Sequence, residues 1–188
     1  MCLLWQDKRG TEKEMVNIQE IKEMYTTGIR AKLYGLEQNE MRDKLRKTYK
    51  DLIPESTFEF GCNVGMNIKD LPNHYGIDIN NEAILKGREL GINVYLGDEK
   101  ELNVMPDNSY ELVMTSSILD HIPDENFKEI FTNLKRITSK YLVCLETNDE
   151  LDIDLFAHDY SSMTPLWEYH SKRPKGNNAN YTCYLWIK

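Results

Sequence analysis

Four residues in the middle of this sequence could together hold an adenosyl group. Gly61 and Gly65 would allow a tight turn in which the backbone comes close to a ligand. Asp78, seventeen residues after Gly61, can accept hydrogen bonds from both ribose hydroxyls, because a carboxylate has two oxygens. Asp98, twenty residues further on, could accept a hydrogen bond from the exocyclic amine of adenine. The G-x-x-x-G spacing differs from the G-x-G-x-x-G loop of dinucleotide sites, so it favours a cofactor without a pyrophosphate.

Each of these residues also has an ordinary structural explanation. Glycine turns are common between a strand and a helix, an acid at a helix entry is favoured by the helix dipole, and aspartate is frequent in turns. These residues follow one another in the sequence on consecutive predicted strands, and this order favours an adenosyl-binding site over three unrelated structural roles.

Proton transfer is the second kind of chemistry that the sequence could support. His121 is the preferred general base, because histidine titrates near neutral pH, and its neighbour Asp120 is the alternative. His121 could instead pack against or cap the helix that begins near Asp124. A second polar cluster could contact a substrate, and it consists of His158, Asp159 and Tyr160.

The elements that must position these residues alternate between strands and helices. Apolar runs predict strands at residues 57–60, 75–79, 92–96, 110–115 and 141–145. Asn80 is placed to cap a helix over 82–90, and Asp124 to cap a helix with an apolar stripe. This alternation predicts an α/β fold with a mostly parallel sheet, in which ligands bind beyond the carboxyl ends of the strands. Strands at 166–169 and 181–187 should add an antiparallel hairpin at one edge.

The first 55 residues predict a helical N-terminal extension to a single unit spanning 56–188. Thr11 and Glu14 have the spacing of a capping box, and an apolar stripe over 41–52 ends before Pro54. We expect these helices to cover the cofactor as a lid. The candidate substrate contacts in or near this lid are Tyr25, Arg30 and Tyr34.

The composition narrows the class of protein further. The net charge of −8 opposes binding to a phosphate backbone, although residues 42–50 form a locally basic run. The four cysteines are scattered without a CxxC pair, so we expect neither a zinc site nor a disulfide framework, and no metal. The sequence lacks a signal-peptide pattern and an apolar run of the ~20 residues that a membrane span requires. A cytoplasmic protein is expected, with nucleic acid and membrane disfavoured as partners.

Several of these runs resemble the motifs of class I methyltransferases, which use S-adenosylmethionine. Residues 59–65 resemble the first motif of that family, E/D-x-G-x-G-x-G, with Asn63 where the family usually has glycine. Residues 75–78 and 96–98 resemble the second and third motifs, and 110–122 resemble the fourth strand with its loop. Residues 61–67 and 156–160 are also similar to small methyltransferases found with pseudaminic acid and other surface-sugar biosynthesis.

The resemblance implies a Rossmann-like fold and a set of cofactor contacts. It places the turn near Gly61 beside the methionine moiety, Asp78 at the ribose, and Asp98 with Glu99 at the adenine edge. Ser116 would line the pocket beneath the sulfonium. The full set of implied cofactor residues is Glu59, Gly61, Cys62, Asn63, Gly65, Asp78, Ile79, Gly97, Asp98, Glu99 and Ser116.

The resulting hypothesis is methyl transfer from S-adenosylmethionine to an oxygen or nitrogen of a small molecule, with a sugar or sugar nucleotide as one candidate. An RNA methyltransferase and a non-catalytic S-adenosylmethionine-binding module remain alternatives. A dehydrogenase is disfavoured, because the sequence shows no second mononucleotide-binding half after the fifth strand.

Overall fold

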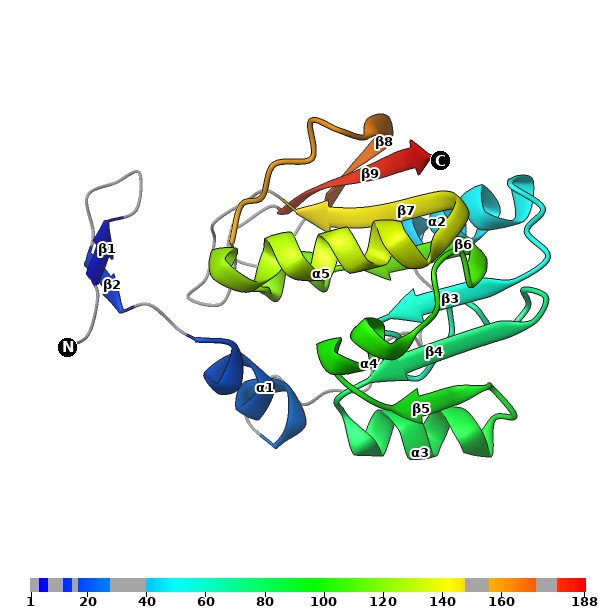
Figure 1. Cartoon of the computed structure of the whole chain (residues 1–188), viewed down its shortest axis with the longest axis horizontal. Helices are drawn as coiled ribbons and strands as arrows, with labels where there is room; N and C mark the ends of the chain where they lie inside the picture. The colour runs from blue at the N-terminus through cyan, green and yellow to red at the C-terminus, as the bar shows by residue number, and fades with distance from the viewer. Residues whose placement is uncertain (1–3, 7–11, 15–16, 28–39, 148–155, 172–178) are drawn as a thin grey trace.

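A seven-stranded sheet forms the centre of the computed structural model, which describes residues 4–6, 12–14, 17–27, 40–147, 156–171 and 179–188 (Figure 1). The strand order is β5-β4-β3-β6-β7-β9-β8. The strands are β3 (Thr57–Phe60), β4 (His74–Asp78), β5 (Val94–Leu96), β6 (Tyr110–Ser116), β7 (Thr138–Thr147), β8 (Thr164–Ser171) and β9 (Ala179–Ile187).

The first five strands of this sheet are parallel, and the C-terminal hairpin is antiparallel. β3 pairs in parallel with both β4 and β6. Strands β4 and β5 extend the sheet on one side of β3 and β6 and β7 on the other, so the strand order reverses at β3, where α/β proteins place their ligands. β9 runs antiparallel to β7 and to β8 at one edge. The prediction of a mostly parallel, Rossmann-like sheet with a C-terminal antiparallel hairpin is confirmed.

Helices cover both faces of the sheet because the sheet strands are apolar on both sides. The helices are α1 (Ile18–Thr26), α2 (Glu40–Asp51), α3 (Asn81–Glu89), α4 (Glu99–Val104), the short 3₁₀ turn η1 (Leu119–His121) and α5 (Asp124–Ile137). Along β6, Val113 packs into the cluster formed with α4 and α5, whereas Leu112 and Met114 pack into the cluster with α2 and α3. Alternate side chains of one strand thus serve two cores. Figure 1 shows α5 crossing one face of β6 and β7.

The N-terminal segment differs from the prediction. The capping box lies at Asn17 and Glu20 instead of Thr11 and Glu14: the Asn17 side chain accepts from the Glu20 N–H, and the Glu20 carboxylate accepts from the Asn17 N–H. α1 therefore begins at Ile18. Residues Leu4–Gln6 (β1) and Glu12–Glu14 (β2) form a short antiparallel pair, which is incompatible with a helix starting at residue 11.

Two further helix starts depart from the sequence prediction. The N-cap of α5 is Pro123, and Asp124 is the first helical residue, where its charge still favours the positive end of the helix dipole. α4 was not predicted, because six residues are too few to show a helical apolar period. None of the described helices is long and apolar enough to cross a membrane.

Candidate functional site

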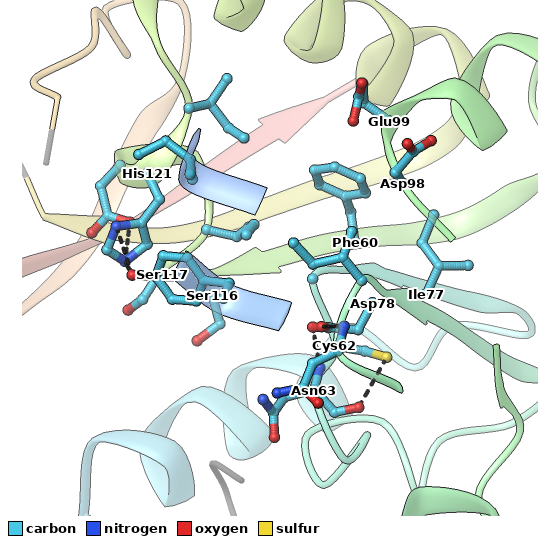
Figure 2. Close-up of a pocket in the computed structure, with 18 of the residues that line it drawn as sticks. Phe60, Cys62, Asn63, Ile77, Asp78, Asp98, Glu99, Ser116, Ser117 and His121 are labelled. Carbon is cyan, nitrogen blue, oxygen red and sulfur yellow. Dashed lines mark hydrogen bonds and ion pairs between the residues drawn. The ribbon is translucent and has the colours of Figure 1, made fainter. Parts of the chain in front are cut away.

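A cavity of about 390 Å³ opens beyond the carboxyl ends of β3, β4, β5 and β6. Its size lies in the range of small-molecule sites, roughly 300–1,000 Å³. Figure 2 shows Asp78 beside the turn at Cys62 and Asn63, with Asp98 and Glu99 toward one side and His121 toward the other. The strand-end residues that the sequence singled out on β3, β4, β5 and β6 therefore meet in one place.

The turn after β3 brings backbone to the cavity wall. Gly61 and Gly65 have φ angles of 72° and 83°, in the left-handed region that favours glycine. Asn63 adopts a φ of 48°, so asparagine occupies a left-handed position in the turn. Gly61 and Cys62 donate their N–H groups to the carbonyl of Ile77, which fixes the turn to the neighbouring strand. Gly61, Cys62 and Asn63 line the cavity, whereas Gly65 is buried beneath it.

Replacing Gly61 with alanine is expected to destabilise the protein by about 2–4 kcal/mol, from backbone strain combined with a clash. An added Cβ would lie 2.6 Å from Cγ1 of Ile118 and 2.9 Å from its Cβ. Gly91→Ala is the matched control, because Gly91 has a similar φ of 74° but no atom within 4 Å of an added Cβ. Urea denaturation of both variants measures the difference. Equal destabilisation of the two would show that close packing at Gly61 has no role.

Asp78 stands at the end of β4 with its carboxylate held by backbone donors. One oxygen accepts from the N–H of Asn63 at 2.7 Å, and the other from the N–H of Asn80 at 2.8 Å. Burial raises the pKa of Asp78, and these backbone donors act against that shift. The N–H of Ile79 also interacts with this carboxylate, and because a carboxylate has about four acceptor sites, Asp78 can still accept a hydrogen bond from a ligand in the cavity.

The next pair of acids contacts a lysine from the N-terminal segment. Asp98 caps α4 through the N–H of Lys100, and the ammonium of Lys22 lies 2.7 Å from Asp98 and 2.8 Å from Glu99. Partial burial acts to raise the pKa of Asp98, but the hydrogen bonds from Lys22 and from the N–H of Lys100, together with the charges of both lysines, hold the pKa below its ordinary value. Gly97 and Ile79 complete this wall of the cavity.

Sequence reasoning missed Lys22, although a signal for it was present. Ile18, Ile21, Lys22 and Tyr25 follow the i, i+3, i+4, i+7 spacing of one helix face, and all four line the cavity. α1 therefore closes one side of the cavity. Further lining residues outside the predicted set come from α2, the turn after β3, and the ends of β6, β7 and β9, and they include Met41, Arg42, Asn67, Ser117, Thr147 and Tyr181.

The opposite end of the cavity carries the candidate proton-transfer groups. The hydroxyl of Tyr25 lies 2.9 Å from Nε2 and 3.0 Å from Nδ1 of His121, which belongs to η1. The carboxylate of Asp120 lies 3.6 Å from Nε2 of the same ring. Ser116, at the end of β6, lines the cavity nearby. The structure thus brings Tyr25, Asp120 and His121 together across a separation of almost a hundred residues in sequence.

Glu59 lies outside the cavity lining. Its side chain is buried, and one oxygen accepts from Nδ2 of Asn67 at 2.7 Å. No donor among the described residues reaches the other oxygen. Burial raises the pKa of Glu59 to about 8.

The second polar cluster also lies outside the cavity lining. His158 stacks on Phe127 at 3.8 Å between ring centroids, and its Nε2 donates to the carbonyl of Leu119 at 2.8 Å. Tyr160 is buried in the core, and Asp159 is exposed and accepts from the N–H of Ser161. Arg30 and Tyr34 fall outside the described residues. Within the described ranges, no group of three or more His, Cys, Asp or Glu side chains could hold a metal ion.

Comparison with known proteins gives one family match and many structural neighbours. Residues 58–141 match the methyltransferase domain family. Comparison with curated proteins by sequence yields no match. Magnesium protoporphyrin IX methyltransferase from Synechocystis, solved with bound S-adenosylmethionine, is 11% identical with a TM-score of 0.60, and the alignment covers 88% of this chain and 95% of that chain.

Two other neighbours have the same fold. TehB from Haemophilus influenzae is 17% identical with a TM-score of 0.64, over 89% of this chain and 66% of that chain. A toxoflavin-precursor N1-methyltransferase from Burkholderia thailandensis, with bound S-adenosylhomocysteine, is 9% identical with a TM-score of 0.58, over 79% and 78%. At these identities the likeness establishes the fold, which is the Rossmann-like methyltransferase fold.

The family match spans residues 58–141, less than half of the chain, and shows that this segment is similar to methyltransferase domains. The resemblance to methyltransferases of pseudaminic acid and surface-sugar biosynthesis receives no support from the family match or from these neighbours.

Proposed function

We propose that this protein transfers the methyl group of S-adenosylmethionine to an oxygen or nitrogen atom of a small polar molecule. One observation carries the proposal: a single cavity joins the glycine turn, Asp78 and Asp98 at one end to His121 at the other. Within this proposal, a sugar or sugar nucleotide is one candidate for the methyl acceptor.

The described residues fit the adenosyl cofactor. The backbone of the turn at Gly61, Cys62 and Asn63 lines the cavity and suits the methionine portion, and the carboxylate of Asp78 suits the ribose hydroxyls. Asp98 and Glu99, with Gly97 and Ile79, would bind the adenine, and Ser116 would line the wall below the sulfonium. S-adenosylmethionine supplies a methyl group that is already activated, so the protein mainly aligns the reactants, which can contribute up to about 7–11 kcal/mol.

His121 is the proposed base for an acceptor that must lose a proton. Its ring lines the cavity with the Tyr25 hydroxyl and the Asp120 carboxylate as neighbours, so a proton from the acceptor has a nitrogen to reach. A positioned base would add on the order of 10²–10⁴-fold in rate. Asp120 is the alternative base in the same turn.

The N-terminal segment of residues 1–55 is proposed as the lid of the site. Four residues of α1 line the cavity, and two of them contact opposite ends: Lys22 binds Asp98 and Glu99, and Tyr25 contacts His121. Closure of the cavity by α1 would exclude water from the transfer step.

A small molecule is favoured over RNA as the acceptor. The basic run at 42–50 lies on α2, where Arg46 pairs with Asp43, Lys47 pairs with Asp51, and the ammonium of Lys44 lies over the Trp167 ring. These contacts and the net charge of −8 oppose binding of a phosphate backbone. We place the activity in the cytoplasm on the sequence grounds given above.

Calorimetry with S-adenosylhomocysteine, S-adenosylmethionine and NAD tests the proposal. We expect micromolar binding of both adenosyl ligands and no comparable binding of NAD, because the turn after β3 lacks the spacing of a pyrophosphate loop. Comparable binding of NAD, or absence of binding by either adenosyl ligand, would overturn the proposal. Mass spectrometry of a metabolite extract incubated with protein and S-adenosylmethionine would then identify the methylated acceptor.

A further inference from the structure

A buried glutamate lies directly behind the turn that carries Asp120 and His121. Glu146, on β7, is fully buried, and both of its oxygens accept hydrogen bonds. Oε1 accepts from the hydroxyl of Thr115 at 2.7 Å. Oε2 accepts from the backbone N–H groups of Ile118 and Leu119 at 3.1 Å each, and of Asp120 at 3.4 Å. Four donors therefore converge on one carboxylate.

The turn η1 needs such an acceptor because of its own sequence. The first N–H groups of any helical turn lack partners within the turn. Polar side chains usually satisfy them from the position just before the turn, but that position is Ile118, whose side chain cannot accept a hydrogen bond. Since β6 and β7 pair with Ser116 opposite Leu145, Glu146 lies one residue beyond this pair and reaches under the turn. It supplies from a neighbouring strand the cap that the local sequence lacks.

The carbonyl groups of the same turn are held from a third segment. The N–H of Phe156 donates to the carbonyl of Asp120 at 2.7 Å, and Nε2 of His158 donates to the carbonyl of Leu119 at 2.8 Å. Donors and acceptors of η1 are thus fixed by residues that are distant in the sequence. The buried side chains of Glu146 and His158 thus have a common structural role, which is to satisfy the backbone groups of η1.

We propose that Glu146 is a positioning residue for methyl transfer, which caps η1 from β7 and so holds His121 at the acceptor end of the cavity. The proposal rests on the proposed function and adds to it a residue that does not line the cavity. It predicts that loss of Glu146 displaces the His121 ring while the adenosyl half of the site, built on β3, β4 and β5, stays intact.

The charge on Glu146 is linked to that of the turn it caps. Burial raises the pKa of Glu146 well above its ordinary value, the nearby carboxyl of Asp120 raises it further, and the hydrogen bonds from Thr115 and from the N–H groups of Asp120 and Ile118 act against that shift.

The test compares Glu146→Gln with Glu111→Gln. Glutamine keeps the volume of glutamate, and its amide nitrogen can donate to the Thr115 hydroxyl while its carbonyl oxygen faces the three backbone N–H groups. These groups then share a neutral acceptor in place of a carboxylate, so their hydrogen bonds weaken. Glu111 is the matched control, because it lies on the neighbouring strand β6 and its carboxylate also accepts a backbone N–H, from Glu55, away from η1. In Glu146→Gln we expect amide exchange of residues 118–120 to accelerate on the order of 10- to 100-fold, the loss expected for a hydrogen bond to a charged group.

A spectroscopic readout separates positioning from a merely structural role. The sequence has four histidines, so imidazole ¹H–¹⁵N spectra can be assigned with a His121→Gln variant. We expect Glu146→Gln to shift or broaden the His121 signals, to leave those of His74 and His170 unchanged, and to keep the affinity for S-adenosylhomocysteine within about threefold of wild type, a change of under 1 kcal/mol. Unchanged His121 signals with normal ligand binding would overturn the positioning role.

Failure of the proposed function gives a different result, because wild-type protein would then bind no S-adenosylhomocysteine. If Glu146→Gln does not fold, hydrogen exchange of the wild-type protein still tests the proposal. The amides of residues 118–120 should be protected at least about 100-fold over free-peptide exchange rates, although they donate to a side chain. Exchange at free-peptide rates would show that Glu146 does not hold the turn.

Discussion

Asp78→Asn is expected to weaken binding of S-adenosylhomocysteine by about 10- to 100-fold, the effect of losing one hydrogen bond to a charged acceptor. Asparagine has the shape of aspartate, but its amide nitrogen cannot accept a hydrogen bond from a ribose hydroxyl. Asp78→Ala removes both oxygens and should weaken binding further. Isothermal titration calorimetry measures both changes.

Because Asp78 also accepts from the N–H groups of Asn63 and Asn80, its replacement will loosen the turn after β3. Thermal unfolding of each variant must therefore accompany the titrations, so that lost affinity is compared among folded proteins. Asp70→Asn is the control, because Asp70 is exposed and lies outside the cavity lining. Normal ligand affinity in Asp78→Ala would show that the carboxylate at the end of β4 has no part in cofactor binding.

The second large effect concerns the pH dependence of stability. The pKa of Glu59 is raised from an ordinary value of 4.5 to about 8 by burial. The folded protein therefore retains a proton on Glu59 that the unfolded chain releases between these pH values. The free energy of unfolding falls as the pH rises through this window, by up to about 5 kcal/mol at about 1.4 kcal/mol per pKa unit.

Glu59→Gln should remove this loss, because glutamine is neutral throughout and its carbonyl oxygen can still accept from Asn67. The variant should gain stability relative to wild type by up to about 5 kcal/mol between about pH 5 and about pH 9. Urea denaturation across that range measures the difference, and the other buried acids cancel because both proteins contain them. A parallel pH profile for wild type and Glu59→Gln would contradict the assignment. Glu129→Gln serves as the control, because Glu129 is exposed on α5.

Short-range patterns in the sequence were enough to predict most of the fold. Apolar runs, the Asn80 cap and the glycine at residue 91, which has a φ of 74°, are local signals that the sheet and helices of the structure follow. The same signals placed Asp78 and Asp98 at strand ends, where parallel pairing brings them to one cavity. They were insufficient at the N-terminus, where the sequence predicted a capping box at Thr11 and Glu14 and the structure has it at Asn17 and Glu20.

The partners of the site residues were decided by the tertiary structure. Lys22 contacts Asp98, 76 residues away in the sequence, and Tyr25 contacts His121, 96 residues away. Glu146, on β7, accepts hydrogen bonds from η1, the turn that follows β6. No local period or spacing encodes these contacts, because they depend on which strands become neighbours and on where α1 packs. The sequence alone thus determined the kinds of groups at each strand end, while the order of the strands and the docking of α1 determined which of those groups face one another.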